Sequence, residues 1–125
     1  MRYVLRLQGA TFAGLAVMLF ATSPSLADDF RKLSDAQIKR LITGKFVGDE
    51  VHYRDHFVPG GKYEGVSMGR SFTGGWEVID GELCLTRFSE RPDCDEIWQS
   101  RKNPALIQLR KAWLSEGKEA FVFEK

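Results

Sequence analysis

From Lys45 to its end, the chain consists of short runs rich in aromatic and β-branched residues, separated by turn-forming residues roughly every ten positions. Connections this short join antiparallel strands, because a parallel crossover needs about a dozen residues or more. Eight strands are predicted, near 45–51, 53–58, 62–68, 75–79, 82–88, 94–99, 105–111 and 119–124. An open sheet of this size would leave exposed edges, so the sequence predicts a mainly β fold, an antiparallel up-and-down sheet curled into a small barrel or half-barrel.

The breaks between these runs have the chemistry of turns. Pro59-Gly60-Gly61 predicts a tight turn, Gly74-Gly75 a flexible join, and Asp80-Gly81 a two-residue hairpin of type I′. Asn103-Pro104 and residues 115–118 close the last two connections.

One short helix is predicted before the strands, over about 35–42. Ser34 and Gln37 have the spacing of a capping box, and Leu33 and Ile38 that of a hydrophobic staple. Gly44 is placed to end the helix as the C′ residue. With Ile38, Leu41 and Ile42 on one face, the helix is expected to cover one end of the sheet, preceded by a loose arm at 28–32.

The two cysteines, Cys84 and Cys94, are placed symmetrically about Ser89. A hairpin turning at 89–92 would bring them opposite each other, so a disulfide between adjacent strands is expected. Closing a loop of this size stabilises a fold by ~3 kcal/mol in the chain-entropy model. A redox pair or a metal site is the alternative, but the spacing is not CxxC and no histidine lies nearby.

Residues 1–27 have the three parts of a cleavable secretory signal peptide. Arg2 and Arg6 precede an uncharged apolar run, and Ser25-Leu26-Ala27 offers small residues where signal peptidase needs them. Cleavage is expected after Ala27, which gives a single β-rich domain of residues 28–125 in the periplasm or the medium. The alternative, an uncleaved membrane anchor, is disfavoured because the apolar run is shorter than the ~20 residues that span a bilayer.

Removing the leader leaves a nearly neutral domain. Of the 18 Lys and Arg, only Arg2 and Arg6 are lost, and all 17 Asp and Glu stay. This mixed charge gives no electrostatic reason to expect nucleic acid or stable membrane insertion.

Candidate polar sites are weak in the sequence. His52 and His56 lie four residues apart, but on one face of a strand their rings would be ~13 Å apart, too far to share a metal. A carboxylate pair for hydrolysis would have to come from the acids that follow, otherwise expected to be solvated. These are Asp55, Asp80, Glu82, Asp93, Asp95 and Glu96. No catalytic residue, metal ligand or cofactor is predicted.

The aromatic side chains are the better candidates for binding. Most are expected in the core, because a barrel this small has little room beyond its own side chains. Those assigned to a ligand or partner surface are Tyr53, Tyr63, Trp76, Trp98 and Trp113. Trp113, which follows Arg110 and Lys111, is the one most expected to act in surface recognition.

The order of these features, with Leu33–Lys45, then Gly75-Trp76 and then Cys84 and Cys94, resembles a group of small exported alphaproteobacterial proteins of unknown function. Their common pattern is a helix and glycine followed by GxW and two cysteines. The resemblance implies a lipocalin-like or half-barrel sheet and assigns no activity. This chain has Asp95 where an aromatic residue often follows the second cysteine.

Three functions remain open from the sequence. The first is an exported, non-enzymatic binding module for a small apolar ligand or a protein partner, including inhibition of an envelope enzyme. The second is a small periplasmic hydrolase using the carboxylates with His52 or His56. The third is a structural subunit of the envelope.

Overall fold

The computed structural model describes residues 29–87 and 91–125, together with Gly9 and Gly14. Almost all of the predicted leader, and part of the predicted turn at 89–92, lie outside the described residues. The elements that the structure defines follow in chain order. They are β1 (Phe30–Lys32), α1 (Asp35–Ile42), β2 (Phe46–Gly48), β3 (Tyr53–Val58), β4 (Lys62–Ser67), β5 (Arg70–Ile79), β6 (Glu82–Thr86), β7 (Asp93–Ser100), β8 (Leu106–Arg110) and β9 (Lys118–Phe123).

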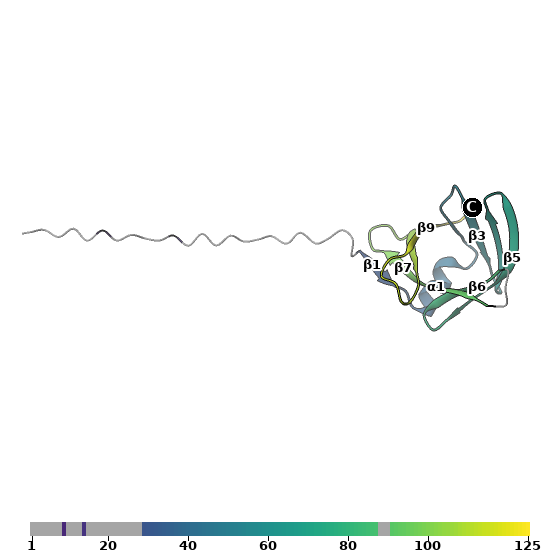
Figure 1. Cartoon of the computed structure of the whole chain (residues 1–125), viewed down its shortest axis with the longest axis horizontal. Coiled ribbons are helices and arrows are strands. Elements are labelled where there is room, and N and C mark those ends of the chain that lie inside the picture. The colour runs from purple at the N-terminus through teal and green to yellow at the C-terminus, as the bar shows by residue number, and fades with distance from the viewer. Residues whose placement is uncertain (1–8, 10–13, 15–28, 88–90) are drawn as a thin grey trace, which may run out of the picture.

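Strands β2 to β9 form a closed, antiparallel, up-and-down barrel of eight strands. Each strand pairs with the next along the chain, and β9 pairs with β2 to close the sheet, with Phe46 opposite Phe123. The barrel, rather than the half-barrel, is therefore the architecture. Strand β1 is additional and pairs with the end of β7. Figure 1 shows α1 between the side formed by β7 and β9 and the side formed by β3 and β5.

An up-and-down barrel has two distinct ends, because its connections alternate between them. The turns at 59–61, 80–81 and 101–105 lie at the end that α1 covers, called here the helix end. The connections at 49–52, 68–69 and 111–117, together with Arg87 after β6 and residues 91–92 before β7, lie at the opposite end, called here the rim. All of the candidate sites described below lie at or near the rim.

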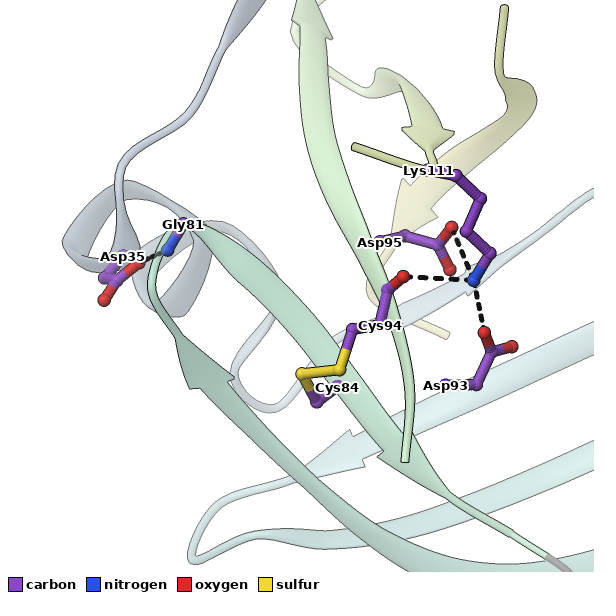
Figure 2. Close-up of a disulfide and its surroundings, with 7 residues drawn as sticks. All are labelled: Asp35, Gly81, Cys84, Asp93, Cys94, Asp95 and Lys111. Atoms are coloured by element: carbon purple, nitrogen blue, oxygen red, sulfur yellow. Dashed lines mark hydrogen bonds and ion pairs between the residues drawn. A yellow bond between two sulfur atoms is a disulfide. The ribbon is translucent and has the colours of Figure 1, made fainter. Parts of the chain in front are cut away.

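Helix α1 begins and ends as the sequence predicts. Ser34 accepts a hydrogen bond from the Gln37 amide, and the Gln37 side chain accepts one from the Ser34 amide. Gly44 has a φ of +76°, the left-handed conformation that a C′ glycine adopts without steric cost. The Asp35 carboxylate accepts a hydrogen bond of 2.6 Å from the Gly81 amide, which ties the helix to the β5–β6 turn (Figure 2).

The helix half of the barrel is filled by its own side chains. Ile38 and Ile42 of α1 are fully buried against inward-facing residues of the strands, including Phe57, Tyr63 and Ile97. Burial of this apolar surface stabilises the fold, at the usual ~25 cal/mol per Å². The interior of the barrel is therefore filled at the helix end.

The disulfide joins β6 to β7 as predicted. Cys84 and Cys94 are directly opposite in the register, and the chain between them closes a loop with a sequence separation of 10. Leu83 and Leu85, which flank Cys84, are buried on the other face of β6. The bond fixes β6 to β7 (Figure 2).

Two local predictions are wrong. The segment at 30–32 is not a loose arm but strand β1, held by β7, with Lys32 bridging to Glu96 at 2.7 Å. Gly74 and Gly75 are not a flexible join, because β5 runs through them from Arg70. A Cβ on Gly74 would lie 1.9 Å from the Thr86 carbonyl oxygen, so glycine is there to let β5 and β6 approach closely.

Candidate functional site

The rim carries the most exposed large apolar side chains of the described residues. Val51 is 80% exposed on the β2–β3 connection, Met68 76% on the β4–β5 turn, and Trp113 78% on the β8–β9 connection. Leu114, next to Trp113, is also exposed. Single exposed apolar residues are common, but apolar tips on three separate connections at one end of a barrel indicate a binding surface.

A groove of about 680 Å³ lies next to this rim on the outer face of the barrel, over β3 and β4, where Arg54 and Val66 alternate with buried, inward-facing residues. Its apolar lining comes from Val51, Val66, Met68 and Phe123, and its polar lining includes Arg54. The remaining lining residues are Glu50, His52, Tyr53, Gly69 and Lys125. We call it the rim groove. Its volume and apolar lining are those of small-molecule sites, and the C-terminus lies close to β3 beside it (Figure 1).

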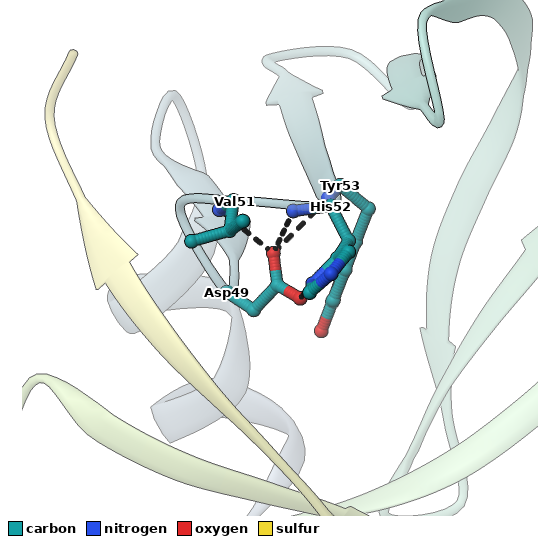
Figure 3. Close-up of polar contacts among 4 residues, drawn as sticks. All are labelled: Asp49, Val51, His52 and Tyr53. Atoms are coloured by element: carbon teal, nitrogen blue, oxygen red, sulfur yellow. Dashed lines mark hydrogen bonds and ion pairs between the residues drawn. The ribbon is translucent and has the colours of Figure 1, made fainter.

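Asp49 holds the loop that carries Val51. Its Oδ1 accepts hydrogen bonds from the amides of Val51, His52 and Tyr53, and its Oδ2 lies 2.8 Å from His52 Nδ1. Desolvation opposes ionisation, but these bonds outweigh it and hold the pKa of Asp49 well below its usual value. Figure 3 shows the carboxylate between Val51 and the side chains of His52 and Tyr53. These hydrogen bonds from backbone amides to the Asp49 carboxylate hold the loop in a conformation in which Val51 is exposed.

Met68 occupies a backbone position that does not favour methionine. It has a φ of +50° and precedes Gly69 at +78°, the left-handed pair of a type I′ turn. Asn, Asp and Gly are the usual residues there, since a larger side chain strains this conformation. Neither packing nor turn geometry accounts for an exposed methionine at this position.

Inside the mouth of the barrel, a buried carboxylate is surrounded by aromatic rings and cations. Asp55 of β3 is 5% exposed and accepts a hydrogen bond from the Tyr63 hydroxyl. Arg87, which follows β6, reaches across the mouth to Asp55 with 3.6 Å between Nη2 and Oδ2. Its guanidinium lies over the rings of Tyr63 and Phe72, 5.3 and 5.5 Å from their centroids. We call this group the mouth cluster.

Lys118 of β9 adds a second cation to the mouth cluster. Its Nζ lies 3.8 Å from the centroid of the Tyr53 ring. Burial, together with Asp55 and Asp49, raises the pKa of Tyr53 to about 12, so its hydroxyl stays protonated. Burial also raises the pKa of Asp55, and it outweighs the hydrogen bond from Tyr63 and the charges of Arg87 and Lys118.

A third cation, Lys111, is fully engaged by its neighbours. Its Nζ bonds to Asp93, lies 3.1 Å from Asp95 and donates to the Cys94 carbonyl at 3.0 Å (Figure 2). Although burial opposes its charge, the two carboxylates raise the pKa of Lys111. These contacts use the donors of the ammonium group, so Lys111 joins β8 to β7 beside the disulfide.

The five aromatic residues predicted for binding do not form one surface. Tyr53 and Tyr63 belong to the mouth cluster, and Trp113 is exposed on the rim. Trp76 instead donates from Nε1 to the Val58 carbonyl at 2.9 Å and packs on Phe57 near the helix end. Trp98 faces outward, with Arg110 stacked on it at 4.2 Å.

The histidines and carboxylates considered for catalysis are dispersed. His52 lies in the loop before β3, not on a strand as predicted, and pairs with Asp49, while His56 lies 3.7 Å from Glu64. The acids at 93–96 are not a solvated corner, because they form part of β7 and bind Lys111 and Lys32. Within residues 29–87 and 91–125, no group of three His, Cys, Asp or Glu could hold a metal ion.

Sequence reasoning missed Arg87, Lys118, Val51 and Met68. Met68 had a detectable signal, an apolar residue beside Gly69 in a turn position. Arg87 and Lys118 had none, because their partners lie in strands that only the closed barrel brings across the mouth.

Comparisons with protein-family models, with curated proteins and with solved structures find no match to this chain. In the part of the chain that the structure describes, no helix has the length and apolar character needed to cross a membrane.

Replacing Asp55 with Asn should change how stability depends on pH. Because the pKa of Asp55 is raised in the folded state above its ordinary 3.8, the folded wild type gains stability as pH falls through that raised pKa. An Asn side chain does not titrate. The free energy of unfolding of Asp55→Asn minus that of the wild type is therefore expected to be larger at pH 7 than near pH 4. Urea unfolding at the two pH values measures it. A difference that stays constant or grows toward low pH would contradict this.

Proposed function

We propose that the mature chain is an exported binding module that holds a small, mainly apolar ligand at the rim of its barrel. The observation that carries this proposal is the concentration of exposed apolar side chains around the rim groove. The groove has the volume of a small-molecule site, which favours a ligand over a protein partner. This role is the one expected of a lipocalin-like barrel.

The division of the barrel into two halves supports binding at the rim. Tyr63, Phe57, Ile97 and Ile107 are fully buried toward the helix end, so a ligand has no space inside the barrel there. At the rim, Leu109 faces inward yet stays partly exposed, in a recess of about 300 Å³ beneath the β8–β9 connection. The rim is therefore the end at which a ligand can meet apolar surface without displacing the core.

Export is supported by the pattern of residues 1–27, and the Cys84–Cys94 disulfide is compatible with an oxidising compartment. Native mass spectrometry of the protein from the exported fraction of its own host should give a chain that starts at Asp28. Its mass should be lower than that of the dithiol by two hydrogen atoms. A full-length mass would contradict the proposal of export.

Met68→Asn separates binding from folding. Asn tolerates the left-handed φ of position 68, so this variant should be more stable by about 0.5–1 kcal/mol in thermal unfolding. Removing the apolar side chain should weaken binding of the uncharged fluorescent probe phenylnaphthylamine by about fivefold. Ile79→Thr is the matched control, because Ile79 is also exposed but lies at the helix end.

Two results would reject the proposed site. One is equal probe affinity in wild type and Met68→Asn. The other is a loss of affinity in Ile79→Thr as large as that in Met68→Asn. Saturable binding that weakens only in Met68→Asn supports the rim groove.

A further inference from the structure

We propose that the mouth cluster binds the anionic group of an amphiphilic organic ligand, with Arg87 as the principal contact and Lys118 as a second cation. This inference rests on the proposed function, because it names the chemical class of ligand that the rim would hold. A carboxylate, sulfonate or phosphate attached to an apolar body has the required chemistry.

The Arg87 guanidinium is held in place by aromatic rings but is not saturated with hydrogen bonds. Its side chain is only about one-third exposed (34%), and it is stacked over Tyr63 and Phe72. Its ion pair with Asp55, at 3.6 Å, is longer than a hydrogen bond. Among the described residues, none accepts a hydrogen bond from it. A guanidinium has five donors in a rigid fork that matches a carboxylate or phosphate, so Arg87 is oriented by the rings and keeps its donors available.

Lys111 lies at the same end of the barrel but, unlike Arg87, is saturated by its neighbours. Lys111 is neutralised by Asp93 and Asp95 and also bonds to a carbonyl oxygen, so it offers no donor to a ligand. In the mouth cluster, by contrast, the only carboxylate near Arg87 among the described residues is Asp55, at 3.6 Å, and Lys118 lies over the Tyr53 ring. With Asp49 near Tyr53 the charges at the mouth are close to balanced, but the Arg87 guanidinium makes no hydrogen bond to a carboxylate, so it can still donate to an anion.

Lys118, the second cation of the mouth cluster, lies close to a residue that lines the rim groove. Tyr53 lines the rim groove, and its ring contacts the Lys118 ammonium. The groove lies on the outer face of β3 and β4 and the mouth cluster on the inner face, and Tyr53, at the rim end of β3, borders both. A ligand with its apolar body on Met68 and Val51 could place an anionic group toward the cations, which is why the ligand is assigned as an amphiphile and not a free inorganic anion.

The test compares two fluorescent probes that have the same rings. Anilinonaphthalene sulfonate carries an anionic group, and phenylnaphthylamine does not. Wild type should bind the sulfonate about tenfold more tightly at constant ionic strength, the size expected for charge-assisted hydrogen bonds. Arg87→Gln should remove this preference and leave the affinity for the uncharged probe unchanged.

Two further variants and a control sharpen the test. Lys118→Gln should weaken sulfonate binding by about threefold, and Asp55→Asn should strengthen it by removing the competing carboxylate. Arg110→Gln is the matched control, because Arg110 is also stacked on an aromatic ring but lies on the outer wall. Near-ultraviolet circular dichroism of each variant should confirm that the fold is intact.

Each outcome has a distinct meaning. If wild type binds neither probe, the proposed function itself fails. If it binds the uncharged probe but shows no preference for the sulfonate, or if Arg87→Gln keeps the preference, the mouth cluster is not an anion site. If inorganic sulfate displaces the sulfonate probe at equal concentration, the apolar body contributes nothing and the assignment to an amphiphile is wrong.

Discussion

The pairing of β9 with β2 is the contact on which the rest of this molecule depends. It closes the sheet, so every strand from β2 to β9 has a partner on both sides. Closure also gives the molecule an interior with two ends. The covering helix and the fully buried aromatic and aliphatic side chains occupy one end, and the other is left with charged groups and exposed apolar tips.

Most of the fold could be predicted because its signals are local. The capping box at Ser34, the glycine at 44 and the Asp80-Gly81 turn each act within a few residues. Strand β1 and the length of β5 could not be predicted in this way. The place of β1 depends on β7, nearly 70 residues away, and Gly74 is required by a contact with Thr86 in another strand.

The candidate site was less predictable for the same physical reason. Tyr53, Tyr63 and Trp113 could be named from the sequence because aromatic residues are common in binding surfaces. The ion pair between Asp55 on β3 and Arg87 after β6 joins residues that have two strands, β4 and β5, between them in the sheet, and their contact arises only through curvature. Trp76 and Trp98 are also assigned to the binding surface from the sequence. In the structure, Trp76 packs on Phe57 near the helix end and Trp98 stacks with Arg110 on the outer wall, because large aromatic side chains also contribute to packing.

The charges at the rim have two different roles. Lys111 and its carboxylates lie beside the disulfide and stabilise the wall where β7 and β8 meet. Arg87 and Lys118 rest on aromatic rings, and Arg87 makes no hydrogen bond to its buried carboxylate partner Asp55. In the proposed function, these two cations are the ones that would meet the anionic group of a ligand.

The most direct test of this account is to map where a ligand contacts the barrel. Amide chemical shifts of the isotope-labelled mature protein would be followed during titration with phenylnaphthylamine. The account predicts saturable shifts at 49–54 and 66–70 and at the end of β9, with little change in α1 or the turn at 80–81. Shifts confined to the helix end, or none that saturate, would contradict the claim that the rim is the binding surface.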